Sequence, residues 1–387
     1  MASRLNPSAL LLEPAIPQEQ KDNAAACVFA PDNVLRIRSD MLSFPDGLST
    51  ALTPLRSRWV AALPPDSPAR NLNFPVMYFL PSHFAYDDKQ FVKELAAGMP
   101  ISGSIPASGV LRPRPTPAIV SLEQWRAPLV PRIRMILGRV LSTHNSLMAT
   151  ACWEHSLREL EKGRITTPTL VTPAVSNTIA ITPRYAKEEP HGGRATKISL
   201  IGDFRAAGIN DAMSLEDTSI PESLGCFLAA IAHFRKLSPD LATESFSLDF
   251  SHAYKHVPII ASQREFATIV MVGPDGNAYS PALRSQPFGS RRAPSNWVRV
   301  TQFPKWALSR FFKIAIAVYV DDIHGAEPLS TAKSAFLNIK AVCALFGCSL
   351  DASKESPPPG RLTFSVLTSK FIKILPTHPS LPIALSP

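Results

Sequence analysis

The sequence is poor in cysteine, and the cysteines that it has form no metal-binding or disulfide pattern. They stand at positions 27, 152, 226, 343 and 348, without a C-x-x-C pair and without a histidine at zinc-ligand spacing. This spacing argues against a zinc module. The odd number of cysteines and their wide scatter predict free thiols in a reducing compartment. Cys343 stands in an apolar helical pattern, so we expect it to be a core residue.

Long apolar runs are also lacking. The longest, Ile314 to Val320, is too short to cross a bilayer. Near the start of the chain, Ser8 to Leu12 is too short for the hydrophobic region of a signal peptide, and Glu13-Pro14 follows it at once. The sequence therefore predicts a soluble, intracellular protein with no membrane partner, and it does not distinguish the nucleus from the cytoplasm.

Proline, in contrast, is abundant. The chain has 387 residues, of which 38 are proline and 45% are hydrophobic. This hydrophobic content is enough for one large domain or two ordinary ones. Many of the prolines fall in residues 1–85, which we predict to be a proline-rich, weakly ordered N-terminal region. Residues 86–175 are predicted to form a helical lead segment with a packing role.

Three helices are predicted in this lead segment. Asp87 is expected to cap the first, which carries Phe91 on its apolar side. The second covers 131–141, and the third is centred on Trp153 and ends near Gly163. The apolar stripes of these helices are typical of core packing rather than of a ligand site.

Basic residues outnumber acidic ones. The chain has 40 lysines and arginines against 31 aspartates and glutamates, which gives a net charge of +9 at neutral pH. Such an excess favours a polyanionic partner, because lysine and arginine make most phosphate contacts. A simple role of this charge in solubility is the alternative.

Acidic residues stand in or directly after two short apolar runs. The run Ile314 to Val320 leads directly into Asp321 and Asp322, and the run Phe246 to Phe250 contains Asp249. Carboxylates on a buried strand are costly unless they have partners or a metal ion. One use for them is to hold divalent cations against phosphate oxygens. A plain β-turn at 321–322 is the alternative.

Five ordered motifs resemble those of the reverse transcriptases of retroelements. Tyr319-Val320-Asp321-Asp322 resembles the YxDD box, and Asp249 to Tyr254 resembles the first palm motif, D-x-x-x-A-Y. Between them, 286–294 resembles the PFG-type motif. Upstream, 199–205 resembles the fingers motif, and downstream, 347–354 resembles the element that ends in S-K. The resemblance covers roughly residues 180–355.

The resemblance implies an α+β fold, the fingers and palm of a right-hand polymerase, over residues 176–356. In such a palm an open β-sheet is backed by helices. The predicted elements follow a suitable order: a helix over 221–236, a strand at Asp249, a hairpin turning at 274–277, a helical region over 293–312 that Pro304 should kink or break, and a helix over 328–346.

The resemblance also implies the activity of an RNA-directed DNA polymerase, which adds dNTPs to a primer 3′-hydroxyl on an RNA or DNA primer–template. The cofactors would be two Mg²⁺ ions, with Mn²⁺ as a substitute, held by Asp249, Asp321 and Asp322. Tyr254 would exclude ribonucleotides by closing the space beside the 2′ position of the sugar. Lys354 would protonate the pyrophosphate leaving group. A core tyrosine and a solvated lysine are the alternatives for these two residues.

Basic residues of the fingers would bind the nucleotide. The resemblance assigns the triphosphate to Lys187, Arg194 and Lys197 of a basic hairpin and to Arg205 of the fingers motif. A solvated hairpin is the alternative. The sequence departs from the family at Ser199, where a lysine or arginine is usual. Serine cannot supply the permanently charged fork of an arginine.

The PFG-type motif would support the template. Phe288 and Gly289 would lie under the templating base pair, where glycine allows a close backbone approach. Arg291 and Arg292 are candidates for contacts to the template, and plain surface residues are the alternative.

The last segment, residues 357–387, is a proline-containing tail. We expect no thumb in it, and no ribonuclease H cluster of acids is recognised. Two other interpretations therefore stay open. In the first, the chain is a catalytically inactive, truncated relic of a retroelement that at most binds nucleic acid. In the second, it is a non-enzymatic interaction protein with coincidental motifs. The oligomeric state is not predicted.

Overall fold

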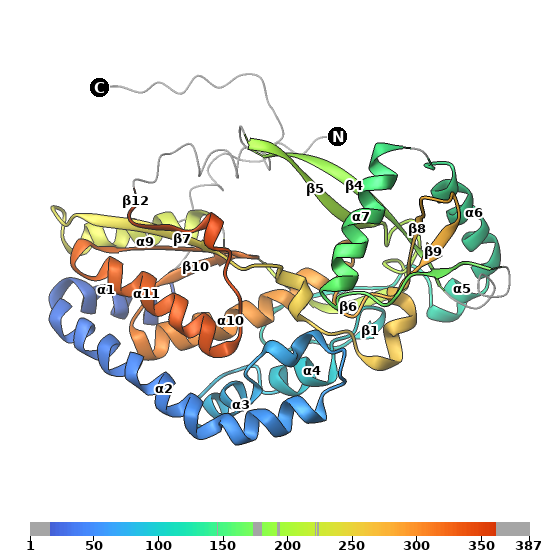
Figure 1. Ribbon diagram of the computed structural model, residues 1–387. Coiled ribbons are helices and arrows are strands. Elements are labelled where there is room, and N and C mark those ends of the chain that lie inside the picture. Colours follow the sequence, from blue (N-terminus) through green and yellow to red (C-terminus); the bar gives the residue numbers. More distant parts are fainter. Residues whose placement is uncertain are drawn as a thin grey trace.

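A computed structural model describes residues 16–144, 146–172, 180–191, 194–220, 222 and 224–360. The described chain contains helices and three β-sheets and is an α+β protein, as expected. Figure 1 shows the elements from the two ends of the described chain gathered on one side, around β7, and the elements α5 to α7, β8 and β9 on the other.

The first side is organised around a four-stranded antiparallel sheet. Its order is β10 (Ile316–Tyr319), β11 (Asp322–Pro328), β7 (Thr243–Asp249) and β12 (Ser356–Gly360). Helices α10 (Ala293–Phe312) and α11 (Leu329–Phe346) pack with it in the largest hydrophobic cluster. The ring of Phe227 from α9 (Leu224–Leu237) lies 5.9 Å from the ring of His324, which points away from that cluster because residues alternate along a strand. Helices therefore cover both faces of this sheet.

The second side is built on a five-stranded sheet. Its order is β3 (Thr169–Leu170), β9 (Ala278–Ser280), β8 (Ile269–Val272), β4 (Thr182–His191) and β5 (Arg194–Gly202). Helices α6 (Leu129–Leu141) and α7 (Leu147–Glu161) pack beside it, as Figure 1 shows. The predicted β8–β9 hairpin and the basic β4–β5 hairpin are both confirmed.

A small third sheet lies between the two sides. Its order is β1 (Gly103–Ile105), β6 (Met213–Thr218) and β2 (Arg112–Thr116). The short helix α5 (Leu122–Arg126) follows, and a capping box between Ser121 and Gln124 satisfies the first backbone N–H groups. The lead segment thus contains strands as well as the predicted helices.

The prediction of a weakly ordered N-terminal region is wrong for the part that the structure describes. From residue 16 onward it forms α1 (Gln18–Phe29), α2 (Pro31–Ala62), a 3₁₀ turn (Pro68–Asn71) and α3 (Phe74–His83). Part of the physical reason is the position of the prolines, although Pro81 stands inside α3. Several lie in the first turn of a helix, where the missing N–H has no partner to lose.

Buried ion pairs join α2 to β11 and α10 to the segment before α4 (Phe91–Ala97). Arg38 of α2 donates two hydrogen bonds to the carboxylate of Glu327 on β11, at 2.7 and 2.9 Å, and both side chains are fully buried. Arg299 of α10 pairs with Asp88 at 2.7 Å. Since a buried charge is tolerated only when it is paired, these contacts fix the helices in place.

The prediction of a helix cap at Asp87 is also wrong, and of the kink or break predicted at Pro304 the break does not occur. Helix α4 (Phe91–Ala97) begins after Gln90, and Asp87 does not cap it; the next residue, Asp88, is bound to Arg299 instead. Helix α10 runs through Pro304 without ending there. Pro304 is buried with the turns on both sides of it, so core packing holds the helix together across the missing hydrogen bond.

The other helix predictions are confirmed. Helices α6, α7, α9 and α11 lie where the apolar stripes placed them, and Cys343 is fully buried. All five cysteines are free thiols, as predicted. The first residues of the tail form β12, an edge strand in which prolines need not donate to a ladder. Residues 361–387 lie outside the described part of the chain.

One described helix, α11, is long and apolar enough to cross a membrane by length and composition alone. Half of it is buried inside the molecule, and it packs against β7 and β11 in the main core. This placement is that of a core helix and is consistent with a soluble protein.

Candidate active site

Strand pairing brings the predicted acidic residues to one place. In the register of β7 and β11, Asp249 stands directly opposite Asp322. Side chains of directly opposed residues share one face of a sheet. Asp321 occupies the tight turn between β10 and β11, and its carbonyl oxygen accepts a hydrogen bond from the backbone N–H of Phe250 at 2.8 Å. Carboxylates from two segments that are far apart in the sequence therefore meet at the end of β7.

The turn that carries Asp321 has an unusual backbone. Val320 has a φ of 57°, in the left-handed region that a β-branched residue rarely adopts. Tyr319 and Asp322 pair across this turn, so the hairpin is closed by only two residues. Such backbone strain is typical of functional turns, and here it sets the position of the Asp321 carboxylate.

Asp249 is the electrostatic centre of the cluster. Burial is the main reason why its pKa is raised to about 6, and the charges of Asp321 and Asp322 raise it further. The ammonium of Lys354 opposes these effects, because its Nζ lies 2.8 Å from Oδ2 of Asp249. Burial alone would lower the pKa of Lys354, but the contact with Asp249 outweighs it and raises the pKa. The predicted lysine is thus placed at the site.

The segment that carries Lys354 is anchored to the strand end. The backbone N–H of Asp351 donates to the carbonyl of Asp249 at 2.9 Å, and that of Ser251 donates to Ser349 at 2.8 Å. The carboxylate of Asp351 caps the short turn Ala352–Lys354. These contacts hold the ammonium of Lys354 beside Asp249.

The carboxylate oxygens of this cluster suit a hard cation, although they do not form a complete coordination shell. Over the residues that the structure describes, no three aspartate, glutamate, histidine or cysteine side chains are grouped as metal ligands. Asp249, Asp321 and Asp322 supply only carboxylate oxygens, which Mg²⁺ prefers, and Mg²⁺ keeps several waters and needs few protein ligands. The repulsion among these carboxylates also favours a cation between them.

An open cleft of about 790 Å³ lies in front of the carboxylates. All five predicted motifs contribute residues to its lining. These include Ser199, Asp249, Tyr254, Phe288, Asp321 and Lys354. The structure therefore brings together residues that the sequence scatters over more than a hundred positions.

Tyr254 lies in the cleft and is only partly buried. Its ring centroid is 5.9 Å from that of Phe288. Burial, together with the charge of Asp321, raises the pKa of its hydroxyl to about 12. Tyr254 thus packs against the main core and also lines the cleft, and its predicted role beside the sugar stays a prediction.

The basic hairpin reaches this cleft with its second strand. Ser199 lines the cleft, and Lys187, which is exposed, is its partner in the β4–β5 register. The side chains of Arg194 and Lys197 lie outside the described part of the structure, and only their backbone pairing is described. Arg205 is exposed in the turn after β5 and does not belong to the described lining of the cleft.

Gly289 makes a close backbone approach, but within the protein. Its φ is 115°, and a Cβ there would lie 2.2 Å from the carbonyl oxygen of Gly202. Asn210 donates to the Gly289 carbonyl at 3.0 Å and accepts from the backbone N–H of Arg291 at 3.0 Å. The glycine thus joins the PFG-type motif to the end of β5, and its predicted place under a base pair stays a prediction.

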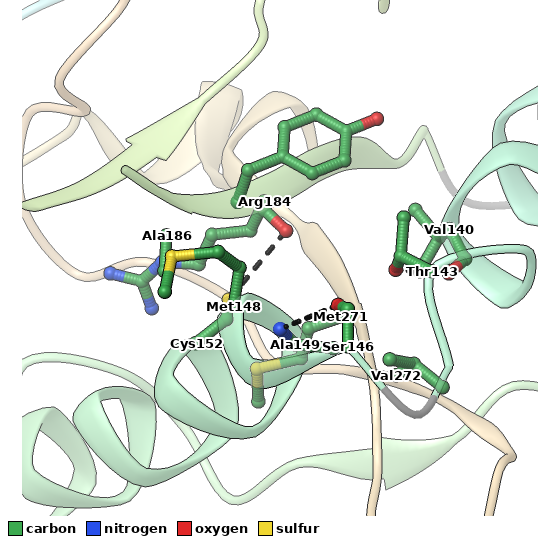
Figure 2. Close-up of a pocket in the computed structure, with 11 residues that line it drawn as sticks. Val140, Thr143, Ser146, Met148, Ala149, Cys152, Arg184, Ala186, Met271 and Val272 are labelled. Carbon is green, nitrogen blue, oxygen red and sulfur yellow. Dashed lines mark hydrogen bonds between the residues drawn. The ribbon is translucent and has the colours of Figure 1, made fainter. Parts of the chain in front are cut away.

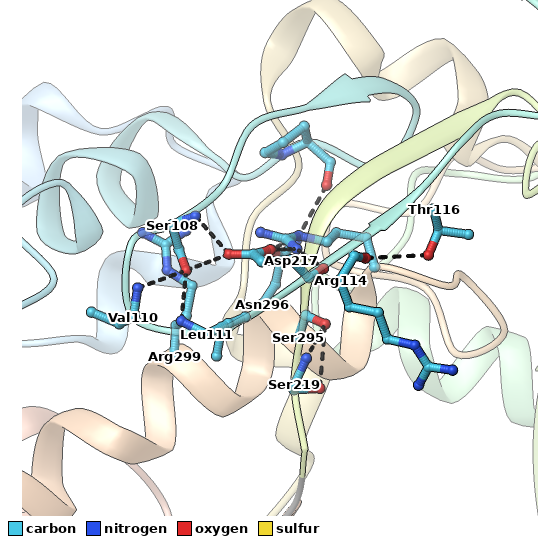
Figure 3. Close-up of polar contacts among 12 residues, drawn as sticks. Ser108, Val110, Leu111, Arg114, Thr116, Asp217, Ser219, Ser295, Asn296 and Arg299 are labelled. Carbon is cyan, nitrogen blue, oxygen red and sulfur yellow. Dashed lines mark hydrogen bonds and ion pairs between the residues drawn. The ribbon is translucent and has the colours of Figure 1, made fainter.

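Arg292 is neither a surface residue nor a template contact. It is buried and donates to Oδ1 of Asp217 at 2.6 Å. Figure 3 shows Asp217 at the centre of this network, with Ser108 bonded to its other oxygen at 2.6 Å. Since the pair is removed from solvent, Arg292 fixes the start of α10 to the small third sheet.

Sequence reasoning missed a cluster of charged residues at the end of α7. Glu159 accepts hydrogen bonds from Arg184 on β4 and from Lys255, the latter at 2.8 Å. Burial alone would raise the pKa of Glu159, but Lys255 and Arg184 hold it at about 2. The sequence carries no local signal for this cluster, because its members come from α7, β4 and the turn after β7.

A second, small pocket of about 60 Å³ lies between α6, α7 and the five-stranded sheet. Figure 2 shows its lining, which includes Val140, Cys152 and Met271. The thiol of Cys152 contacts the carbonyl of Arg184 at 3.6 Å, and burial raises its pKa to about 11. This pocket holds no reactive group and is a packing gap.

Comparison with known proteins adds no family assignment. No protein-family model matches the chain. No curated protein matches it either.

Proposed function

We propose that the chain is the fingers and palm of an RNA-directed DNA polymerase that extends a primer with dNTPs. The observation that carries the proposal is the register that sets Asp249 opposite Asp322, with Asp321 at the adjoining turn. The convergence of five motif segments on one cleft supports it further, because coincidental motifs have no reason to meet in space. The basic excess of the chain suits a nucleic-acid partner.

The carboxylates would hold the metal ions. Asp249 and Asp321 are the proposed ligands of two Mg²⁺ ions, and Asp322 completes the acidic field. Bound there, the ions would stabilise the charge on the attacking and leaving oxygens of phosphoryl transfer. The protein orients these ligands by strand pairing, and it keeps the Asp249 carboxylate buried.

Two neighbouring residues complete the proposed site. Lys354 holds a proton at Nζ inside the cleft, where a pyrophosphate leaving group can accept it. Tyr254, packed near Phe288, narrows the cleft beside the strand end that carries Asp249. A ribose 2′-hydroxyl would clash with the ring, so the site should select deoxynucleotides.

Primer extension tests the proposal. The full chain should incorporate dTTP on poly(rA)/oligo(dT) with Mg²⁺, and Asp321→Asn should reduce incorporation by about 10³-fold. Asp240→Asn is the matched control, because Asp240 is exposed in the turn before β7 and lies outside the cleft lining. Incorporation that survives in Asp321→Asn would refute the assignment of the metal site.

A second candidate is a catalytically inactive polymerase relic that binds nucleic acid. Two observations favour it. Ser199 stands where a basic residue is usual, and Lys354 already forms an ion pair with the Asp249 carboxylate. Tight binding of the primer–template by the unmodified chain, without any extension in Mg²⁺ or Mn²⁺, would support the relic over the enzyme.

A further inference from the structure

The cleft carries opposite charges on its two sides. The four-stranded sheet and its β10–β11 turn contribute the carboxylates of Asp249 and Asp321. The end of α7 and the segment after it contribute Arg158, Lys162 and Arg164. These three cations belong to the lead segment, for which the sequence predicted only a packing role. Such a cleft suits a phosphate ligand with bound cations, because the cations would face the acidic side and the phosphates the basic side.

Among the described residues that line the cleft, Glu159 is the only acid from α7, and two cations already share it. Glu159 pairs with both Arg184 and Lys255. Among the described residues, the Arg164 side chain makes no hydrogen bond and no ion pair, although it is half-buried. Burial lowers its pKa, and the charge of Glu159 only partly opposes this. A half-buried guanidinium without a partner costs free energy, which a bound anion would recover.

These cations lie close to the turn that follows Asp249. His252, in this turn, adopts a left-handed backbone with a φ of 61° and lines the same cleft. Partial burial is the main reason why the pKa of His252 is lowered to about 4, and the charges of Arg164 and Lys162 are the next largest causes. The imidazole is therefore neutral at pH 7, and two full positive charges stand beside it.

We infer that Arg164 and Lys162 form a polyphosphate subsite that binds the triphosphate of the incoming nucleotide, in place of the cation that Ser199 does not supply. The inference rests on the proposed function, which it deepens. The two cations are compactly placed near the end of β7, and a triphosphate is a compact polyanion. A nucleic-acid backbone would need an extended track of cations. Lys187, opposite Ser199 in the hairpin, would approach the same ligand from the other side.

Two measurements on the full chain test the subsite. The first is calorimetric binding of inorganic tripolyphosphate, without template or metal. Arg164→Ala should weaken this binding about tenfold, as expected for the loss of a charged, bidentate donor, and Lys162→Ala about threefold. Arg134→Ala is the matched control, because Arg134 is exposed on α6 and lies outside the cleft lining. Arg164→Lys should restore part of the loss.

The second measurement is the KM for dTTP in primer extension. Arg164→Ala should raise the KM about tenfold and leave kcat within about threefold. Unchanged tripolyphosphate binding in both cleft variants would overturn the subsite. A higher Kd for primer–template with an unchanged KM for dTTP would also overturn it, since the cations would then contact nucleic acid. Lys162→Ala, at an exposed position, keeps the test valid if Arg164→Ala fails to fold.

The two proposals fail in different ways. If the unmodified chain does not extend a primer, but tripolyphosphate binding still depends on Arg164, the subsite stands and the polymerase proposal falls. If extension occurs and depends on Asp321, but neither measurement responds to Arg164 or Lys162, the polymerase stands and the subsite falls.

Discussion

The two sides of the cleft are built in different ways. On the acidic side, strand register alone sets Asp249 against Asp322, and the hairpin turn adds Asp321. On the basic side, the ion pairs of Glu159 hold α7 against β4 and Lys255, and Arg164 in the next segment accepts a backbone hydrogen bond from Arg284. Local backbone pairing places the first set of charges, and tertiary packing places the second. Removing a charge on each side should therefore have different consequences.

The largest effect is expected on the acidic side. Asp249→Asn removes a carboxylate at the proposed reaction centre, so primer extension should fall by about 10³-fold or more. The fold should not suffer, because the substitution removes a buried charge whose pKa is raised. Extension assays and thermal unfolding on the same sample test whether activity is lost while stability is kept. A lowered Tm together with retained extension would show that Asp249 has a structural role instead.

A large effect on stability is expected from the pair that attaches α2 to the strand of Asp322. Arg38→Ala leaves the carboxylate of Glu327 buried and unpaired, which should cost about 3–5 kcal/mol of unfolding free energy. Arg36→Ala is the control, since Arg36 forms an exposed pair with Asp40 on the same helix and should change stability by less than about 1 kcal/mol. Urea unfolding distinguishes them. Equal effects would show that the N-terminal helices do not support the sheet.

The difference between the two sides also explains what the sequence could predict. The acidic site was predictable, because an apolar β-branched run that ends in Asp321 and Asp322 specifies a strand and a turn by itself. The helices α6, α7, α9 and α11 were predictable from their apolar stripes. Arg164 was not, since its backbone is held by a hydrogen bond from Arg284, which is far away in the sequence.

The failures have the same origin. Prolines in residues 1–85 indicated disorder, but their positions in first helical turns and the burial of Arg38 against Glu327 stabilise helices there. Pro304 was expected to kink or break a helix, and the core keeps that helix unbroken. Arg292 looked like a template contact until the fold buried it against Asp217. In each case a long-range contact outweighed a local propensity.

A smaller effect is expected where the two sides meet, at Tyr254. Tyr254→Ala should open the space next to Phe288 and raise the relative use of rUTP over dTTP by about ten- to a hundredfold. The ratio of kcat/KM for the two nucleotides measures this effect. Tyr185→Ala, on the hairpin and outside the cleft lining, is the control. An unchanged ratio would remove Tyr254 from the sugar site.

The smallest effect concerns the pH dependence of the basic side. The pKa of Glu159 is about 2 in the folded chain, below its usual value of 4.5, so its ion pairs stabilise the fold above pH 4.5. This contribution should be lost as the pH falls from about 4.5 towards 2, and about 1–2 kcal/mol should disappear. The difference in unfolding free energy between the unmodified chain and Glu159→Gln should shrink over this range. A difference that is constant with pH would mean that Glu159 is not paired.

The most direct test of the central claim is a crystal of the full chain grown with Mn²⁺ and a non-hydrolysable dNTP. Mn²⁺ substitutes for Mg²⁺ at carboxylate sites and is located by its anomalous scattering. We predict an anomalous peak within coordination distance of Asp249 and Asp321, with the nucleotide phosphates beside it in the cleft. Well-ordered nucleotide without Mn²⁺ at these carboxylates, or Mn²⁺ bound elsewhere on the chain, would contradict the polymerase account.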